Sequence, residues 1–187
     1  VGGFYLFKIN YLKKCKNFLD GKTAGYMLGD VDRLIRCRDH GVTPDFIERL
    51  SVLGFTRLTA DKLVRTRDHG VTPDYIRGMH SLGYPNQALE AYITLKDHGI
   101  SIGYIKGMGD AGYTWASLDA LRRLKDHGVT ADYIQDLHDL GFKDLSLDEF
   151  VEAHNHGVTP DYIQGMNDLG FKDLPIHELQ RMKGHGF

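Results

Sequence analysis

Six His-Gly pairs recur along the chain, and histidine is a residue suited to metal binding or to a pH-dependent switch. Always 29 residues apart, the pairs begin at His40, His69, His98, His127, His156 and His185. Packed helices lie about 10 Å apart, whereas zinc lies about 2 Å from its ligands. Neighbouring histidines of this row therefore cannot share a metal, and we expect each ring to bond the last carbonyls of its own helix. His154, His156 and His127 form a local group that merits a metal titration.

Basic residues stand two positions before most of these histidines, an arrangement able to grip an acidic partner or a phosphate backbone. This basic column consists of Arg38, Arg67, Lys96, Lys125 and Lys183, with His154 in the remaining copy. A second, broken basic row consists of Arg36, Arg65, Arg123 and Arg181. Because Asp39 and Asp68 directly follow column residues, a solvated, salt-bridged face is the simpler interpretation.

Trp115 is the only tryptophan, and it stands where other copies of the repeat carry Arg57, Asn86 and Asp144. A tryptophan in a loop is a plausible interface anchor, although covering a weak neighbouring repeat is an equal alternative. The residues that we predict to contact a partner are Arg38, Arg67, Lys96, Lys125 and Trp115.

Catalytic motifs are missing from the sequence, which has no GxSxG, no P-loop and no dinucleotide-binding glycine pattern. Nearly every titratable residue occupies a repeating position, which is typical of scaffolds rather than of active sites. We therefore predict that the protein is not an enzyme and has no catalytic residue, cofactor or metal site.

Composition bounds the remaining possibilities. The chain has 187 residues, 42% of them hydrophobic, which is enough for a sizeable core, and a formal charge of −2. That charge gives no general attraction to nucleic acid or membranes. Cys15 and Cys37 are too few for a disulfide framework, so they leave the compartment open, with a cytoplasmic location slightly favoured.

The elements that must position these residues are short helices. A second row of glycines keeps the same 29-residue interval, and each is followed by Tyr or Phe; it consists of Gly25, Gly54, Gly83, Gly112, Gly141 and Gly170. Each period has two sets of helix start and stop signals. An unbroken period of this size indicates stacked repeats, so we predict an all-α fold, an α-solenoid of two-helix repeats, over residues 25–187.

Capping residues mark both helices. Thr43 is a suitable N-cap, followed by Pro44 at the first helical position, and Gly54 suits a left-handed C-terminal turn. The caps expected for the first helix of the repeat are Asp30, Thr59, Ser117 and Ser146, the last forming a capping box with Glu149.

The third copy departs from this pattern. Ser101-Ile102-Gly103 replaces Thr-Pro-Asp, and further glycines follow, so we predict a soft or bent point near residues 101–112. Gly78, Gly107 and Gly165 share one mid-helix position, which favours close approach of a neighbouring helix.

Residues 1–24 precede the first complete repeat and begin with an apolar run followed by lysines. We interpret them as a helical cap or a leader segment, the end of a membrane span being the alternative. No stretch of the sequence is long and apolar enough for a complete transmembrane helix.

Two sequence motifs of the chain resemble a bacterial tandem repeat: His-Gly-Val-Thr-Pro-Asp-Tyr-Ile and Leu-Gly-Phe-Lys-Asp-Leu-Ser-Leu-Asp-Glu. Such repeats lie near the C-termini of some BlaR1-like membrane metallopeptidases. The resemblance covers about residues 25–187 and implies an array appended to sensors, with no catalytic role. The metallopeptidase signature His-Glu-x-x-His is missing, so no protease activity is implied.

These observations favour a protein-protein interaction scaffold that presents an extended surface to a protein or peptide. Nucleic-acid binding through the basic column is an alternative. Self-assembly through the terminal repeats is another.

Overall fold

The structure is a computed structural model that describes residues 28–187, with side chains described from residue 32 onward. The proposed cap or leader over residues 1–24 lies outside the described residues. Contacts along the chain define two compact units, Val1–Asp97 and His98–Phe187. Each unit is described by itself.

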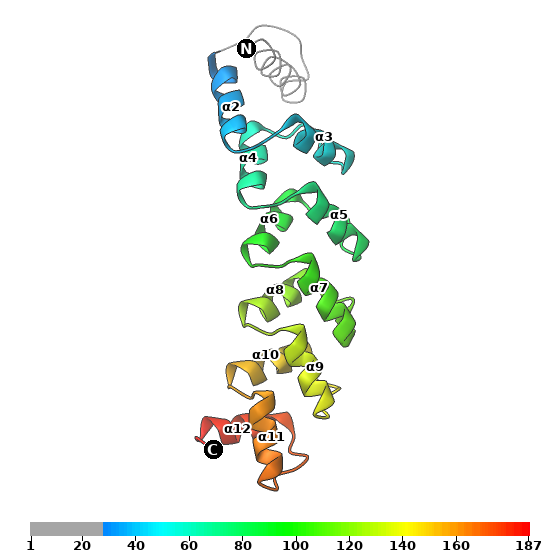
Figure 1. The fold of residues 1–187 in the computed structure, drawn as a ribbon, viewed down its shortest axis with the longest axis vertical. Coiled ribbons are helices and arrows are strands. Elements are labelled where there is room, and N and C mark those ends of the chain that lie inside the picture. Colours follow the sequence, from blue (N-terminus) through cyan, green and yellow to red (C-terminus); the bar gives the residue numbers. More distant parts are fainter. Residues whose placement is uncertain (1–27) are drawn as a thin grey trace, which may run out of the picture. The chain divides into compact units, whose positions relative to one another are not determined.

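Both units are built from short helices (Figure 1). The described part of the first unit contains α2 (Leu28–Asp39), α3 (Pro44–Val52), α4 (Ala60–Asp68), α5 (Pro73–Ser81) and α6 (Leu89–Asp97). The second contains α7 (Ile102–Met108), the π-helical turn η1 (Gly109–Tyr113), α8 (Leu118–Asp126), α9 (Ala131–Asp139), α10 (Leu147–Asn155), α11 (Pro160–Asp168) and α12 (Ile176–Gly184). No strand occurs between residues 28 and 187, so the all-α prediction is confirmed there. None of these helices combines the length and apolar character needed to cross a membrane.

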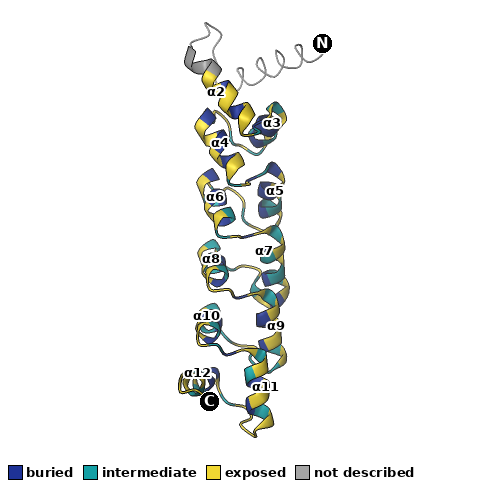
Figure 2. Cartoon of the chain, turned by 60° about the vertical axis from the view of Figure 1, so that its left-hand side comes forward, coloured by how far each residue is buried: buried dark blue, intermediate teal, exposed yellow. Residues whose placement is uncertain are grey.

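The repeats alternate a first helix (the even-numbered helices α2 to α12) with a second helix (the odd-numbered helices α3 to α11). Within a unit, first helices pack against first helices and second helices against second helices. In the first unit α2 contacts α4 and α3 contacts α5; in the second, α8 contacts α10, α10 contacts α12, α7 contacts α9, and α9 contacts α11. The helices carry buried residues on one side and exposed residues on another (Figure 2). The residue after each His-Gly pair is completely buried in five copies, at Val42, Val71, Ile100, Val129 and Val158. The core therefore runs between the two helix types of each unit.

The N-terminal caps act as the sequence predicts. The Thr43 hydroxyl accepts a hydrogen bond from the backbone N–H of Phe46, and Pro44 begins α3. Ser146 and Glu149 form the capping box of α10. The caps predicted at Thr59 and Ser117 are confirmed as well. Thr72, Thr130 and Thr159 cap the helices that occupy the position of α3 in later copies. Asp30 is an exception, because α2 begins at Leu28 and includes it.

The C-terminal turns follow the Schellman pattern. At the end of α3, Gly54 has a φ of 94°, a conformation that glycine adopts without steric cost. The Phe55 N–H donates to the Leu50 carbonyl at 3.0 Å, and the Gly54 N–H donates to the Ser51 carbonyl at 3.0 Å. These bonds satisfy carbonyls that would otherwise be left without partners at the helix end.

The third copy has the irregular geometry predicted from its glycines. Ser101 still caps α7, but this helix has seven residues and runs into η1, where Gly112 has a φ of 99°. A Cβ built on Gly107 would lie 3.1 Å from the Cβ of Ala131 on α9, which confirms the close approach there. At Gly165 that prediction is wrong, because a Cβ would meet nothing within 4 Å.

Candidate functional site

The basic column stacks on aromatic rings. On α4, the Arg67 guanidinium carbon lies 5.5 Å from the centroid of the Phe46 ring on α3. The Lys125 Nζ on α8 lies 4.9 Å from the centroid of the Tyr104 ring on α7. The same contact joins Lys96 to Tyr75 at 4.9 Å and Lys183 to Tyr162 at 4.5 Å. In the copy without a basic residue, the His154 ring meets Tyr133 edge to face at 5.1 Å. These cation–π contacts link a helix of one repeat to a helix of the next within a unit.

Tyrosine hydroxyls reinforce the same junctions. The Tyr133 hydroxyl donates to the Val158 carbonyl at 2.8 Å, and the Tyr104 hydroxyl donates to the Val129 carbonyl at 3.1 Å. Burial raises the pKa of Tyr133 and of Tyr104 well above the ordinary value, and it raises the pKa of Tyr75 to about 12. These phenols therefore stay protonated at neutral pH and keep their donor hydrogens.

Removing one stacked charge is expected to weaken the fold slightly. Lys125→Gln keeps most of the side-chain stem but removes the ammonium over Tyr104, so the free energy of unfolding should fall by about 0.5–1 kcal/mol. Lys143→Gln is the matched control, since Lys143 is exposed and stacks on no described ring. Urea unfolding followed by circular dichroism measures both, and equal stabilities for the two variants would contradict the structural role of the Lys125 contact.

The histidine row makes contacts that the sequence did not predict. The Nδ1 of His40 lies 2.8 Å from a carboxylate oxygen of Asp68, and the Nδ1 of His69 lies 2.6 Å from Asp97. In the second unit the corresponding pairs are His98 with Asp126 at 2.6 Å and His127 with the Asn155 amide oxygen at 3.0 Å. A carboxylate only accepts, so Nδ1 is the donor in each His–Asp pair. The expected bond to a carbonyl of the histidine's own helix occurs at His156, whose Nδ1 contacts the Glu152 carbonyl at 2.8 Å. The expectation is wrong for His40, His69, His98 and His127.

The local histidine group does not converge on a point. His127 turns to Asn155, His154 packs on Tyr133, and His156 bonds the Glu152 carbonyl. Within residues 28–187, no group of three or more His, Cys, Asp or Glu side chains is placed to hold a metal ion.

The second basic row forms ion pairs between neighbouring helices. Arg123 on α8 reaches Asp148 on α10 at 2.7 Å, and Arg65 on α4 reaches Glu90 on α6 at 3.2 Å. Arg36 pairs with Asp61 at 2.5 Å, whereas Arg181 pairs within its own helix with Glu178 at 2.6 Å. These pairs agree with the predicted salt-bridged face.

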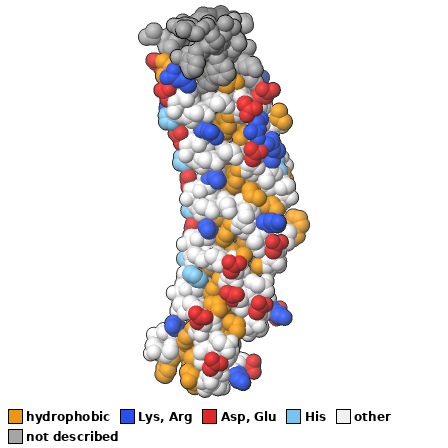
Figure 3. All heavy atoms as spheres, in the orientation of Figure 1, with side chains coloured by type: hydrophobic (Ala, Val, Ile, Leu, Met, Phe, Trp, Pro, Cys, Tyr) orange, Lys and Arg blue, Asp and Glu red, His pale blue; other side chains and the backbone are white. Residues whose placement is uncertain are grey.

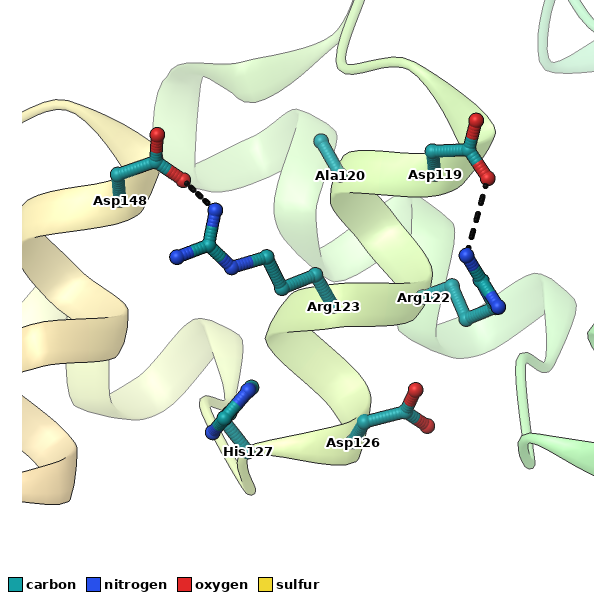
Figure 4. A pocket seen from close by; sticks show the side chains of 7 residues that line it. All are labelled: Asp119, Ala120, Arg122, Arg123, Asp126, His127 and Asp148. Carbon is teal, nitrogen blue, oxygen red and sulfur yellow. Dashed lines mark hydrogen bonds and ion pairs between the residues drawn. The ribbon is translucent and has the colours of Figure 1, made fainter.

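A shallow depression of about 440 Å³ lies on this face of the second unit. Its lining residues are Asp119, Ala120, Arg122, Arg123, Asp126, His127 and Asp148. Figure 4 shows Arg123 directed to Asp148 and Arg122 turned the other way to Asp119. Because these arginines are already paired and solvent-exposed, the depression offers little unused charge for a ligand.

None of the five predicted contact residues lines this depression. In the first unit Arg38 pairs with its neighbour Asp39 at 2.7 Å, and Arg67 and Lys96 lie over rings. In the second unit Lys125 is stacked, whereas Trp115 is 84% exposed in the loop after η1. Such exposure contradicts the alternative in which Trp115 covers the third copy.

Comparisons of the chain with protein-family models, with curated proteins and with solved structures found no match. The resemblance to the repeats of BlaR1-like metallopeptidases therefore rests on the residues of this chain alone.

Proposed function

We propose that the chain is an α-solenoid of two-helix repeats with a 29-residue period, and that it serves as a non-catalytic protein-protein interaction scaffold. Packing between helices of the same type within each unit supports the architecture. Repeats joined mainly to their neighbours produce long surfaces rather than enclosed pockets, which suits the binding of extended partners.

The exposure of Trp115 is the observation that carries the functional proposal. A tryptophan left in water loses the gain from burying its large apolar surface, and exposed aromatic anchors are enriched at protein interfaces. Most other candidate side chains already have partners inside their unit: the column residues Arg67, Lys96 and Lys125 stack on rings. These contacts also make the basic column a weaker candidate for gripping a nucleic-acid backbone.

Replacing Trp115 is therefore expected to remove binding without unfolding the protein. The tagged full chain, incubated with an extract of its source organism, should retain a partner that Trp115→Ala retains about tenfold less. Lys143→Ala is the control, because it changes another exposed loop residue of the same unit. Affinities of the recovered partner for all three proteins, measured by calorimetry, provide the quantitative comparison.

Two results would contradict the proposal. If Trp115→Ala retains the partner as well as the unchanged chain does, Trp115 is not the anchor. If only nucleic acid is retained, with an affinity that falls steeply with salt, the nucleic-acid alternative takes its place.

A further inference from the structure

Trp115 has no cation of the described residues over its ring, unlike the four rings of Phe46, Tyr75, Tyr104 and Tyr162. The four Lys or Arg stacking contacts described above show that this chain repeatedly pairs an aromatic face with a cation. Tryptophan is the best cation–π acceptor among the side chains. Yet no Lys or Arg of the described residues lies over Trp115. The Trp115 ring is thus available to a cation from another molecule.

Charge is distributed very unevenly along the sequence, which identifies the chemistry of such a molecule. Residues 126–171 contain ten Asp or Glu side chains and a single Lys, and so carry a formal charge of −9 in a chain whose total is −2. This segment supplies α9, α10 and α11 of the second unit. Acidic side chains gather over α9 and α11 on the face drawn in Figure 3.

The carboxylates of α9 and α11 lack the basic partners that the first unit provides. In the first unit Asp74 on α5 pairs with Arg49 on α3 at 2.7 Å and also with Arg77, and these two hydrogen bonds lower the pKa of Asp74. At the positions equivalent to Arg49 and Arg77, α9 has Asp136 and Gln135.

The exposed acids on these two helices are Asp132, Asp136, Asp139, Asp161 and Asp168. Among the described residues, none of these five forms an ion pair with Lys or Arg; Asp139 and Asp168 accept hydrogen bonds from Gln135 and Gln164 at 3.0 Å. The negative charge of these five carboxylates is therefore not offset by a Lys or Arg of the described residues.

The loop of Trp115 is joined to the acidic segment 126–171 by a hydrogen bond. The hydroxyl of Tyr113 donates to the Leu145 carbonyl at 3.0 Å, which joins the loop of Trp115 to the loop before α10. Asp144 lies in that second loop, and its charge acts on Tyr113, whose pKa is raised by burial and further by this carboxylate. The indole of Trp115 and the carboxylate of Asp144 therefore belong to adjoining loops of one unit.

We propose that Trp115 and the acidic surface of α9 and α11 together bind a Lys- and Arg-rich peptide segment of a partner protein. The acids of this surface are Asp132, Asp136, Asp139, Asp161 and Asp168 on α9 and α11, together with Asp144 in the loop joined to that of Trp115. One cation of the peptide stacks on the indole, and the others pair with the carboxylates. This inference rests on the proposed scaffold function and adds the chemical class of the partner.

The test uses the full chain and a fluorescently labelled peptide of Arg, Lys and Leu, compared with a peptide in which Glu replaces the basic residues. Binding is measured by anisotropy at low salt and at about 0.15 M NaCl. Because Trp115 is the only tryptophan, its emission reports contact at this residue. We expect the basic peptide to bind and to change that emission, more weakly at the higher salt, and the Glu peptide not to bind.

Asp136→Arg is the most informative variant, because it installs in α9 the residue type that α3 carries as Arg49. By the same 25-residue spacing as Arg49 and Asp74, the new guanidinium would engage Asp161. We expect about tenfold weaker peptide binding for this variant and for Trp115→Ala. Asp45→Asn is the matched control, since Asp45 lies in the first turn of α3 as Asp132 does in α9, and binding should be unchanged.

The outcomes separate this inference from the scaffold function. If the basic peptide fails to bind, or binds Asp136→Arg as tightly as the unchanged chain, the inference is overturned. In that case a Trp115-dependent partner recovered from extract would leave the scaffold function standing with a partner of other chemistry. If neither experiment detects Trp115-dependent binding, both proposals fail. Circular dichroism of each variant verifies that a loss of binding is not a loss of folding.

Discussion

Phe150→Ala is expected to lower the free energy of unfolding of the second unit by about 3–5 kcal/mol. The Phe150 side chain on α10 is completely buried. Its ring meets Tyr113 at 5.9 Å and Tyr133 at 6.5 Å between centroids, both nearly edge to face. Alanine would remove contacts with both η1 and α9. It would also leave a cavity that short capped helices cannot easily close.

Trp115→Ala provides the comparison for this variant within the same unit. It removes an even larger aromatic side chain, but one that is 84% exposed, so the free energy of unfolding should change by less than about 0.5 kcal/mol. Urea unfolding followed by circular dichroism suits both variants, because the signal does not depend on the tryptophan. A loss below about 1.5 kcal/mol for Phe150→Ala would show that the ring is not enclosed as described.

The local structure of the chain could be predicted because its signals lie a few residues apart. Thr43 caps the helix that begins beside it, and that helix ends where the N–H groups of Gly54 and Phe55 donate to the carbonyls of Ser51 and Leu50. Such interactions depend on backbone geometry within one turn, so the residue types alone indicate them. The irregular third copy was predictable for the same reason, from several glycines within about one or two helical turns of each other.

Contacts between copies could not be predicted in this way. The ring of Tyr104 and the ammonium of Lys125 are 21 residues apart, and His98 and Asp126 are 28 apart. Both offsets recur in other copies, so a search for constant spacings between complementary residue types would have found them. Their meaning depends on which faces of neighbouring helices meet, which short-range signals do not determine.

The exposure of Trp115 could not be predicted from the sequence for a different reason. A loop residue has no periodic neighbours from which burial can be inferred, so anchor and cover were equal interpretations of the sequence. Likewise, the net charge of −2 conceals the acidic segment 126–171, because basic residues elsewhere offset it. A running sum of charge along the chain would have identified this segment.

Two equivalent junctions of the chain differ by one hydroxyl group, and this difference predicts opposite effects on stability. In the first unit the His80 Nε2 lies 3.1 Å from the Tyr92 hydroxyl, which in turn donates to the Tyr84 carbonyl at 3.3 Å. Two periods later the same positions hold His138 and Phe150. Lacking that hydroxyl, the buried His138 Nε2 has no hydrogen-bond partner among the described residues.

Phe150→Tyr is therefore expected to raise the free energy of unfolding by about 1 kcal/mol, because the new hydroxyl can meet His138 Nε2. Tyr92→Phe should lower it by about 1–3 kcal/mol, since His80 and the Tyr84 carbonyl would both lose a partner. Phe142→Tyr is the control: it adds a hydroxyl in the same unit at a half-exposed ring with no unpaired group to satisfy, and its effect should stay within about 0.5 kcal/mol. Urea unfolding of the three variants measures these changes in the free energy of unfolding. If Phe150→Tyr instead destabilises the protein, the space beside His138 is too small for a hydroxyl group. The Nε2 of His138 would then be unpaired because no polar group fits next to it.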